Sequence, residues 1–75
     1  MPSGEQIFNA AIEQQLGGNL GEAERLYKIF LADHPERDDA HFGYGLLCLG
    51  DGRKEDAVRN FERALFLSPG NVDYW

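Results

Sequence analysis

Basic side chains are scarce in this sequence. Its 75 residues hold seven Lys and Arg against thirteen Asp and Glu, which gives a formal net charge of −6, and neither half of the chain is basic. Proteins that bind nucleic acid or anionic membranes draw their affinity from clustered Lys and Arg. The composition therefore argues against nucleic acid and membrane surfaces as partners, and we expect the acidity to form a solvated surface that aids solubility.

Cysteine and long apolar runs are nearly absent as well. The single Cys48 cannot form an intramolecular disulfide, and it lies in the apolar run 46–49, where a thiol usually serves as a small buried hydrophobe. A reducing compartment fits this usage best. The first residues lack the basic and apolar regions of a signal peptide, and no apolar run approaches the ~20 residues that span a bilayer. We therefore expect a soluble, cytoplasmic protein.

Motifs for catalysis or cofactor binding are also missing. His34 and His41 flank a turn and could be imagined, with Cys48, as metal ligands, but no C-x-x-C or H-E-x-x-H spacing accompanies them. No Ser, Cys or Lys is paired recognisably with a general base, and the glycine pairs are too sparse for a phosphate-binding loop. We expect no catalytic residue, no cofactor and no metal site.

What the sequence does contain is helical periodicity. Between 54 and 67 the apolar residues recur at the spacing of one helix face, and they are Ala57, Val58, Phe61, Ala64 and Leu65. The same criterion predicts helices at about 6–16, 21–33 and 40–49. The third of these is apolar around most of its circumference, so it should have neighbours on more than one side.

Capping and turn residues mark the ends of these helices. Ser3 precedes Gln6 at the spacing of a capping box, and Asp38 and Asp39 are placed to cap the third helix. Gly17-Gly18 ends the first helix, since glycine adopts the left-handed backbone at no steric cost. Gly43 and Gly45 lower helix propensity by about 1 kcal/mol each, which indicates that another helix comes close to them.

The helices repeat with a period of 34 residues. Gly18, Ala23, Arg25, Tyr27, Leu31 and Pro35 lie under Gly52, Ala57, Arg59, Phe61, Leu65 and Pro69. A fixed period of this length indicates a repeat array, in which stacked units share one continuous core.

The pattern resembles the tetratricopeptide repeat, a helix-turn-helix unit of 34 residues. In the register set by Pro35 and Pro69, Gly45 falls on the family's helix A glycine, Ala57 and Ala64 on its two small positions. The aromatic position between them is Phe61, whereas Tyr44 and Cys48 replace the usual leucine and tyrosine.

The resemblance implies an all-α helix-turn-helix repeat solenoid with two repeats, 4–37 and 38–71, and thus four antiparallel helices. Residues 72–75 would be the start of a truncated third repeat or a capping tail, with Trp75 at a position where the family typically has tryptophan.

In the family the first helices of successive repeats line a concave groove. The matching positions are Glu5, Phe8, Ile12, Gln15 and Leu16 in repeat one and Asp39, Phe42, Leu46, Leu49 and Gly50 in repeat two. The groove should therefore be apolar with an acidic rim. The expected partner-binding residues are Phe8, Ile12, Gln15, Phe42, Leu46 and Leu49. Family members that hold a C-terminal carboxylate use lysine and asparagine at these places, so that use is disfavoured.

The resemblance implies a non-enzymatic scaffold that binds a protein or peptide in this groove. Two alternatives stay open at this point. The chain could be the repeat segment of a larger enzyme, or a self-associating module. A homo-oligomer could form through the groove or through the uncovered last repeat, where Val58, Leu65 and Phe66 would be exposed.

Overall fold

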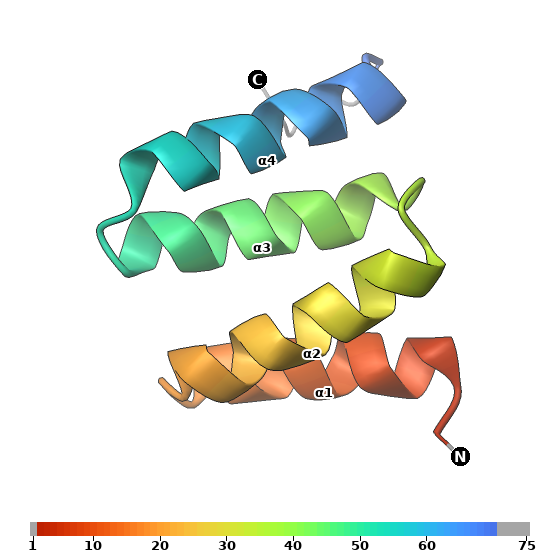
Figure 1. Cartoon of the computed structure of the whole chain (residues 1–75), viewed down its shortest axis with the longest axis vertical. Coiled ribbons are helices and arrows are strands. Elements are labelled where there is room, and N and C mark those ends of the chain that lie inside the picture. Colours follow the sequence, from red (N-terminus) through yellow and green to blue (C-terminus); the bar gives the residue numbers. More distant parts are fainter. Residues whose placement is uncertain (1, 71–75) are drawn as a thin grey trace.

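The computed structural model describes residues 2–70, and in this range the chain forms four α-helices. Helices α1 (Gly4–Leu16) and α2 (Leu20–Asp33) form one antiparallel pair, and α3 (Asp38–Gly50) and α4 (Lys54–Leu67) form another. Figure 1 shows α3 between α2 and α4, so the third helix has neighbours on two sides, as its apolar circumference predicted. The all-α repeat architecture is thereby confirmed. The predicted start of a third repeat at 72–75 lies outside the described residues.

The first helix begins with the predicted capping box. The Ser3 hydroxyl accepts a hydrogen bond from the Gln6 amide at 3.2 Å, and the Ser3 amide donates to the Gln6 side chain at 2.8 Å. The cap predicted for the third helix is wrong. Asp38 and Asp39 lie inside its first turn, where their charges favour the helix dipole, and Arg37 is the N-cap without a side-chain cap bond.

The two helix-pair turns have the same backbone, 34 residues apart. Gly18 and Gly52 adopt φ of 83° and 80°, a left-handed conformation that glycine tolerates without a Cβ clash. The Asn19 amide donates to the Gln14 carbonyl and the Arg53 amide to the Cys48 carbonyl, both at 2.8 Å. The sequence period therefore corresponds to a structural period.

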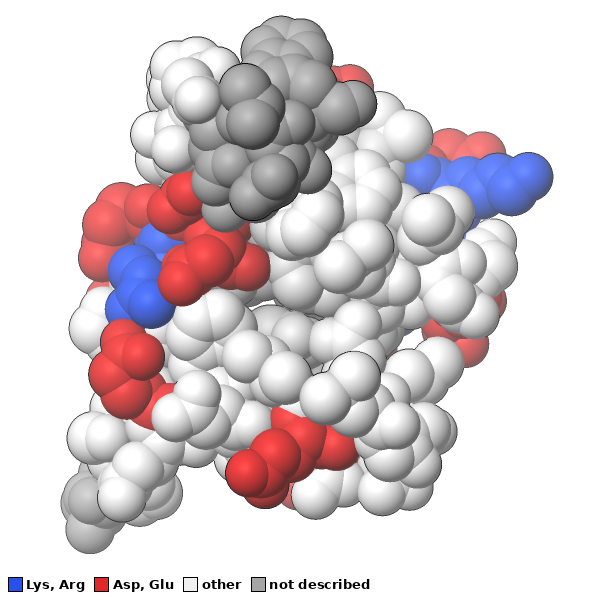
Figure 2. All heavy atoms as spheres, turned by 180° about the vertical axis from the view of Figure 1, so that it is seen from behind, with Lys and Arg blue, Asp and Glu red and all other residues white. Residues whose placement is uncertain are grey.

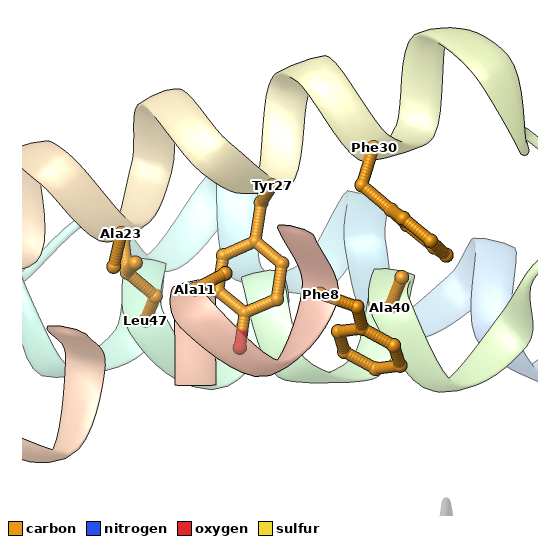
Figure 3. Close-up of a cluster of buried hydrophobic side chains, with 7 residues drawn as sticks. All are labelled: Phe8, Ala11, Ala23, Tyr27, Phe30, Ala40 and Leu47. Atoms are coloured by element: carbon orange, nitrogen blue, oxygen red, sulfur yellow. The ribbon is translucent and has the colours of Figure 1, made fainter. Parts of the chain in front are cut away.

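The main core lies where α1, α2 and α3 meet. Its buried side chains are Phe8, Ala11, Ala23, Tyr27, Phe30, Ala40 and Leu47 (Figure 3). Figure 3 shows Phe30 reaching from α2 toward Phe8 on α1, and the two rings stack at a centroid distance of 5.0 Å. Full burial of one such side chain stabilises the fold by about 1.5–3 kcal/mol. The small alanines between the rings let the helices approach.

Glycines permit two close approaches to α3. A Cβ at Gly43 would lie 2.8 Å from the Tyr27 hydroxyl of α2, and one at Gly45 would lie 2.7 Å from the Phe61 ring of α4. The predicted reason for these glycines is confirmed. One position on α4 differs from its prediction: Val58 was assigned to the inward face but is exposed, because the helix buries the stripe through Ala57 and Ala64 instead.

Candidate binding face

The first helices of the two pairs, α1 and α3, lie side by side and present one common surface. We call this surface the binding face and define it by Ile12 and Leu16 of α1 and Phe42, Leu46 and Leu49 of α3. Figure 2 views the molecule from behind, the side on which α1 lies in front of α2. That side is hollowed and mostly uncharged in its middle, with acidic side chains at its margins.

The aliphatic side chains of the binding face are open to solvent. Ile12 is 37% exposed, Leu46 44% and Leu49 50%, and Leu16 is more exposed still. Ile12 and Leu46 are equivalent residues of the two repeats, so the helical period places them in corresponding positions. Contiguous exposed aliphatic groups of this kind mark sites where another surface docks.

Phe8, although it was predicted among the partner-binding residues, is only 7% exposed. Its ring packs against Phe30 and meets Tyr27 edge-on, and the Arg37 guanidinium lies 5.5 Å from the ring centroid. Phe8 therefore supports the binding face from below, because its contact area is already used by α2 and the loop after it.

Gln15 holds three helices together. Its side-chain oxygen accepts a hydrogen bond from the Tyr27 hydroxyl at 2.6 Å, and its amide nitrogen donates to the Gly43 carbonyl at 3.4 Å. Burial raises the pKa of Tyr27 to about 12, so the hydroxyl stays protonated and able to donate. Gln15 thus fixes the spacing of α1 and α3 from a half-buried position.

Phe42 is half-buried, and its ring lies 5.5 Å from that of Phe61 on α4. It therefore joins the aliphatic part of the binding face to the contact between α3 and α4. Among the six predicted partner-binding residues, the structure brings Ile12, Phe42, Leu46 and Leu49 to the surface of the face, and it sets Phe8 and Gln15 beneath it.

One end of the binding face carries an ion-pair network around Arg37. Its guanidinium donates to Glu5 on α1 at 2.6 Å and to Asp39 on α3 at 2.9 Å. Hydrogen bonds to Asp39 and Glu5 raise the pKa of Arg37 above its ordinary range, so it is charged at any physiological pH. Exposed pairs of this kind contribute little to stability, about 0–1 kcal/mol each, but this one ties the two helices of the face together.

A second polar network, which the sequence analysis did not identify, connects the two repeats behind the face. Glu24 of α2 accepts hydrogen bonds from the Tyr44 hydroxyl at 2.8 Å and from Arg53 at 2.6 Å. These bonds, the one from Tyr44 first, hold the pKa of Glu24 below its usual value. Tyr44 also stacks on Tyr27 at 5.9 Å. The tyrosine at a position where the repeat usually has leucine was the available signal.

The residues considered as metal ligands have other neighbours. His34 packs on the Phe30 ring at 4.8 Å, His41 lies 2.9 Å from the Pro35 carbonyl through Nε2, and Cys48 is a buried free thiol. Within residues 2–70 no group of three His, Cys, Asp or Glu side chains is placed to hold a metal ion. Burial raises the pKa of Cys48, which disfavours its thiolate.

Comparison with known proteins gives one family. A family model described as tetratricopeptide repeat matches residues 8–72. No curated protein matches the chain. Of the helices that the structure describes, none is long and apolar enough to cross a membrane.

Proposed function

Because this chain belongs to the tetratricopeptide repeat family, we propose that it is a non-enzymatic scaffold whose binding face takes a segment of a partner protein. Tetratricopeptide repeats generally mediate protein–protein interaction. The observation that carries the proposal is the row of solvent-exposed aliphatic side chains, Ile12, Leu46 and Leu49, across two adjacent helices. These side chains would contact the partner, with Phe42 beside them and with Phe8 and Gln15 in support.

The boundaries 4–37 and 38–71 remain our prediction for the two repeats. We also propose a cytoplasmic location, supported by the buried, unpaired thiol of Cys48, which suits a reducing compartment.

The chain offers a matched control for testing the face. Leu46→Ser/Leu49→Ser removes two of its aliphatic side chains, while Ile29→Ser/Val58→Ser removes two outside it that are similarly exposed, at 40% and 51%. All four residues lie within helices, so the cost in helix propensity is similar. A phage-displayed library of random peptides would be selected on the unchanged protein and then rebound to both variants.

We expect the selected peptides to bind the control variant as they bind the unchanged protein and to lose at least about tenfold in affinity on the face variant, because each aliphatic contact contributes on the order of 1 kcal/mol. Circular dichroism checks that both variants fold. Equal binding to the face variant would refute the proposal.

Self-association is a second candidate function, and the exposed apolar side chains of α4 favour it. Phe66 is 74% exposed, and Val58 lies on the same helix. Sedimentation velocity from below to above micromolar concentration tests this candidate. A dimer that Phe66→Ser disrupts would support it, and a folded monomer throughout the range would exclude it.

A further inference from the structure

Charge is segregated between the helices of each pair. Helices α1 and α3 carry four carboxylates and neither Lys nor Arg, whereas every basic side chain of the sequence belongs to α2, α4 or a loop. The four carboxylates are Glu5, Glu13, Asp38 and Asp39. The two helices that form the binding face are therefore also the two that supply only negative charge.

Only one basic side chain reaches these carboxylates from outside α1 and α3. Arg37 is shared between Glu5 and Asp39, at 2.6 Å and 2.9 Å, so one positive charge faces two negative ones. Glu13 follows Ile12 directly, is exposed, and takes part in none of the ion pairs among residues 2–70. The aliphatic centre of the face is thus bordered by carboxylates in excess over their cations.

Building on the proposed function, we propose that the partner segment is cationic as well as apolar: a peptide stretch in which Leu, Ile or Val side chains alternate with Lys or Arg. Its aliphatic groups would cover Ile12, Leu46 and Leu49, and its cations would lie against Glu13 and the Arg37 network. Opposite charges across an interface raise the association rate and exclude partners of the wrong sign. Two copies of this face brought together by a two-fold axis would oppose their own carboxylates, so a second copy fits it poorly.

Three synthetic peptides of equal length and identical leucine positions test the sign of the charge. Their remaining positions are all Lys, all Gln or all Glu, and binding to the whole chain is measured by isothermal titration calorimetry. We expect the Lys peptide to bind at least about tenfold more tightly than the Glu peptide, with the Gln peptide between them, and the difference to shrink as salt is added.

Charge reversal locates the effect. Glu13→Lys changes the binding face, and Glu62→Lys makes the same change in net charge on an exposed position of α4. We expect the first variant to weaken the Lys peptide by about threefold or more and the second by less than about twofold. Equal weakening by both variants would overturn the inference, since overall charge alone would then explain it.

The outcomes separate this inference from the proposed function. If the Gln and Lys peptides bind equally and Leu46→Ser/Leu49→Ser abolishes both, the scaffold role stands and the cationic preference is refuted. If none of the three peptides binds while the phage selection yields peptides that the face variant loses, the cationic preference again fails alone. If neither the peptides nor the selection gives binding, both proposals fail.

Discussion

Replacing Gly45 with alanine tests the close approach of α3 and α4. The new Cβ would lie 2.7 Å from two atoms of the Phe61 ring and 3.3 Å from Cβ of Asn60, whereas ordinary contact begins at 3.4 Å. The ring has little room to give, because Phe42 lies against it at 5.5 Å. The helices would therefore have to separate by several tenths of an ångström.

Two opposing terms set the size of the effect. Alanine raises helix propensity by about 0.5–1 kcal/mol over glycine, and overpacking a well-filled contact costs about 1–3 kcal/mol. The overpacking cost should exceed the gain, because the contact involves a ring held on its other side. We expect a net loss of about 1–2 kcal/mol in the free energy of unfolding, which corresponds to a fall in Tm of about 4–8 °C per kcal/mol.

Thermal and urea unfolding followed by circular dichroism measure this loss. Gly50→Ala is the control in the same helix, since no atom lies within 4 Å of its Cβ, and it should be neutral or stabilise by up to about 1 kcal/mol. In a Phe61→Leu background, which removes the ring, Gly45→Ala should lose most of its cost, and the double-mutant cycle gives the coupling directly. A Gly45→Ala protein as stable as the Gly50→Ala protein would refute the reasoning.

Two further predictions concern the cap of α1 and the buried tyrosine. Ser3→Ala removes the side-chain cap and should lower the free energy of unfolding by about 1 kcal/mol in urea titrations, while Ser3→Asp, which restores an acceptor, should recover most of it. Burial raises the pKa of Tyr27 from 10.0 to about 12. Since the folded pKa exceeds the unfolded one, this contribution to stability is complete below about pH 10 and is lost as the pH rises to about 12, by up to about 3 kcal/mol. Tyr27→Phe should flatten the alkaline fall in stability, and an unchanged slope would contradict the assignment.

The helices and their repeat could be predicted because both depend on local rules. Amphipathic spacing and the glycine at Gly18 and Gly52 act within one turn of backbone, so the sequence alone specifies them. The cap of α3 was missed because Asp38 and Asp39 suit a cap and a first helical turn almost equally well. Periodicity also gives a side chain's direction but not its depth. Phe8 shares the direction of Phe42 yet is buried, because Phe30 and Tyr27 arrive from another helix to cover it.

The binding face and the contact between repeats are structurally dependent on each other. Gln15 reaches α3 through the Gly43 carbonyl and α2 through Tyr27, and Tyr27 in turn stacks on Tyr44. Tyr44 is held by Glu24, whose lowered pKa keeps it ionised at neutral pH. A ligand that spans α1 and α3 therefore bears on a spacing that these polar contacts fix. Because an unpaired buried polar group costs more than a paired one gains, any change in that spacing is opposed by the loss of its hydrogen bonds, and a preformed face is what such contacts maintain.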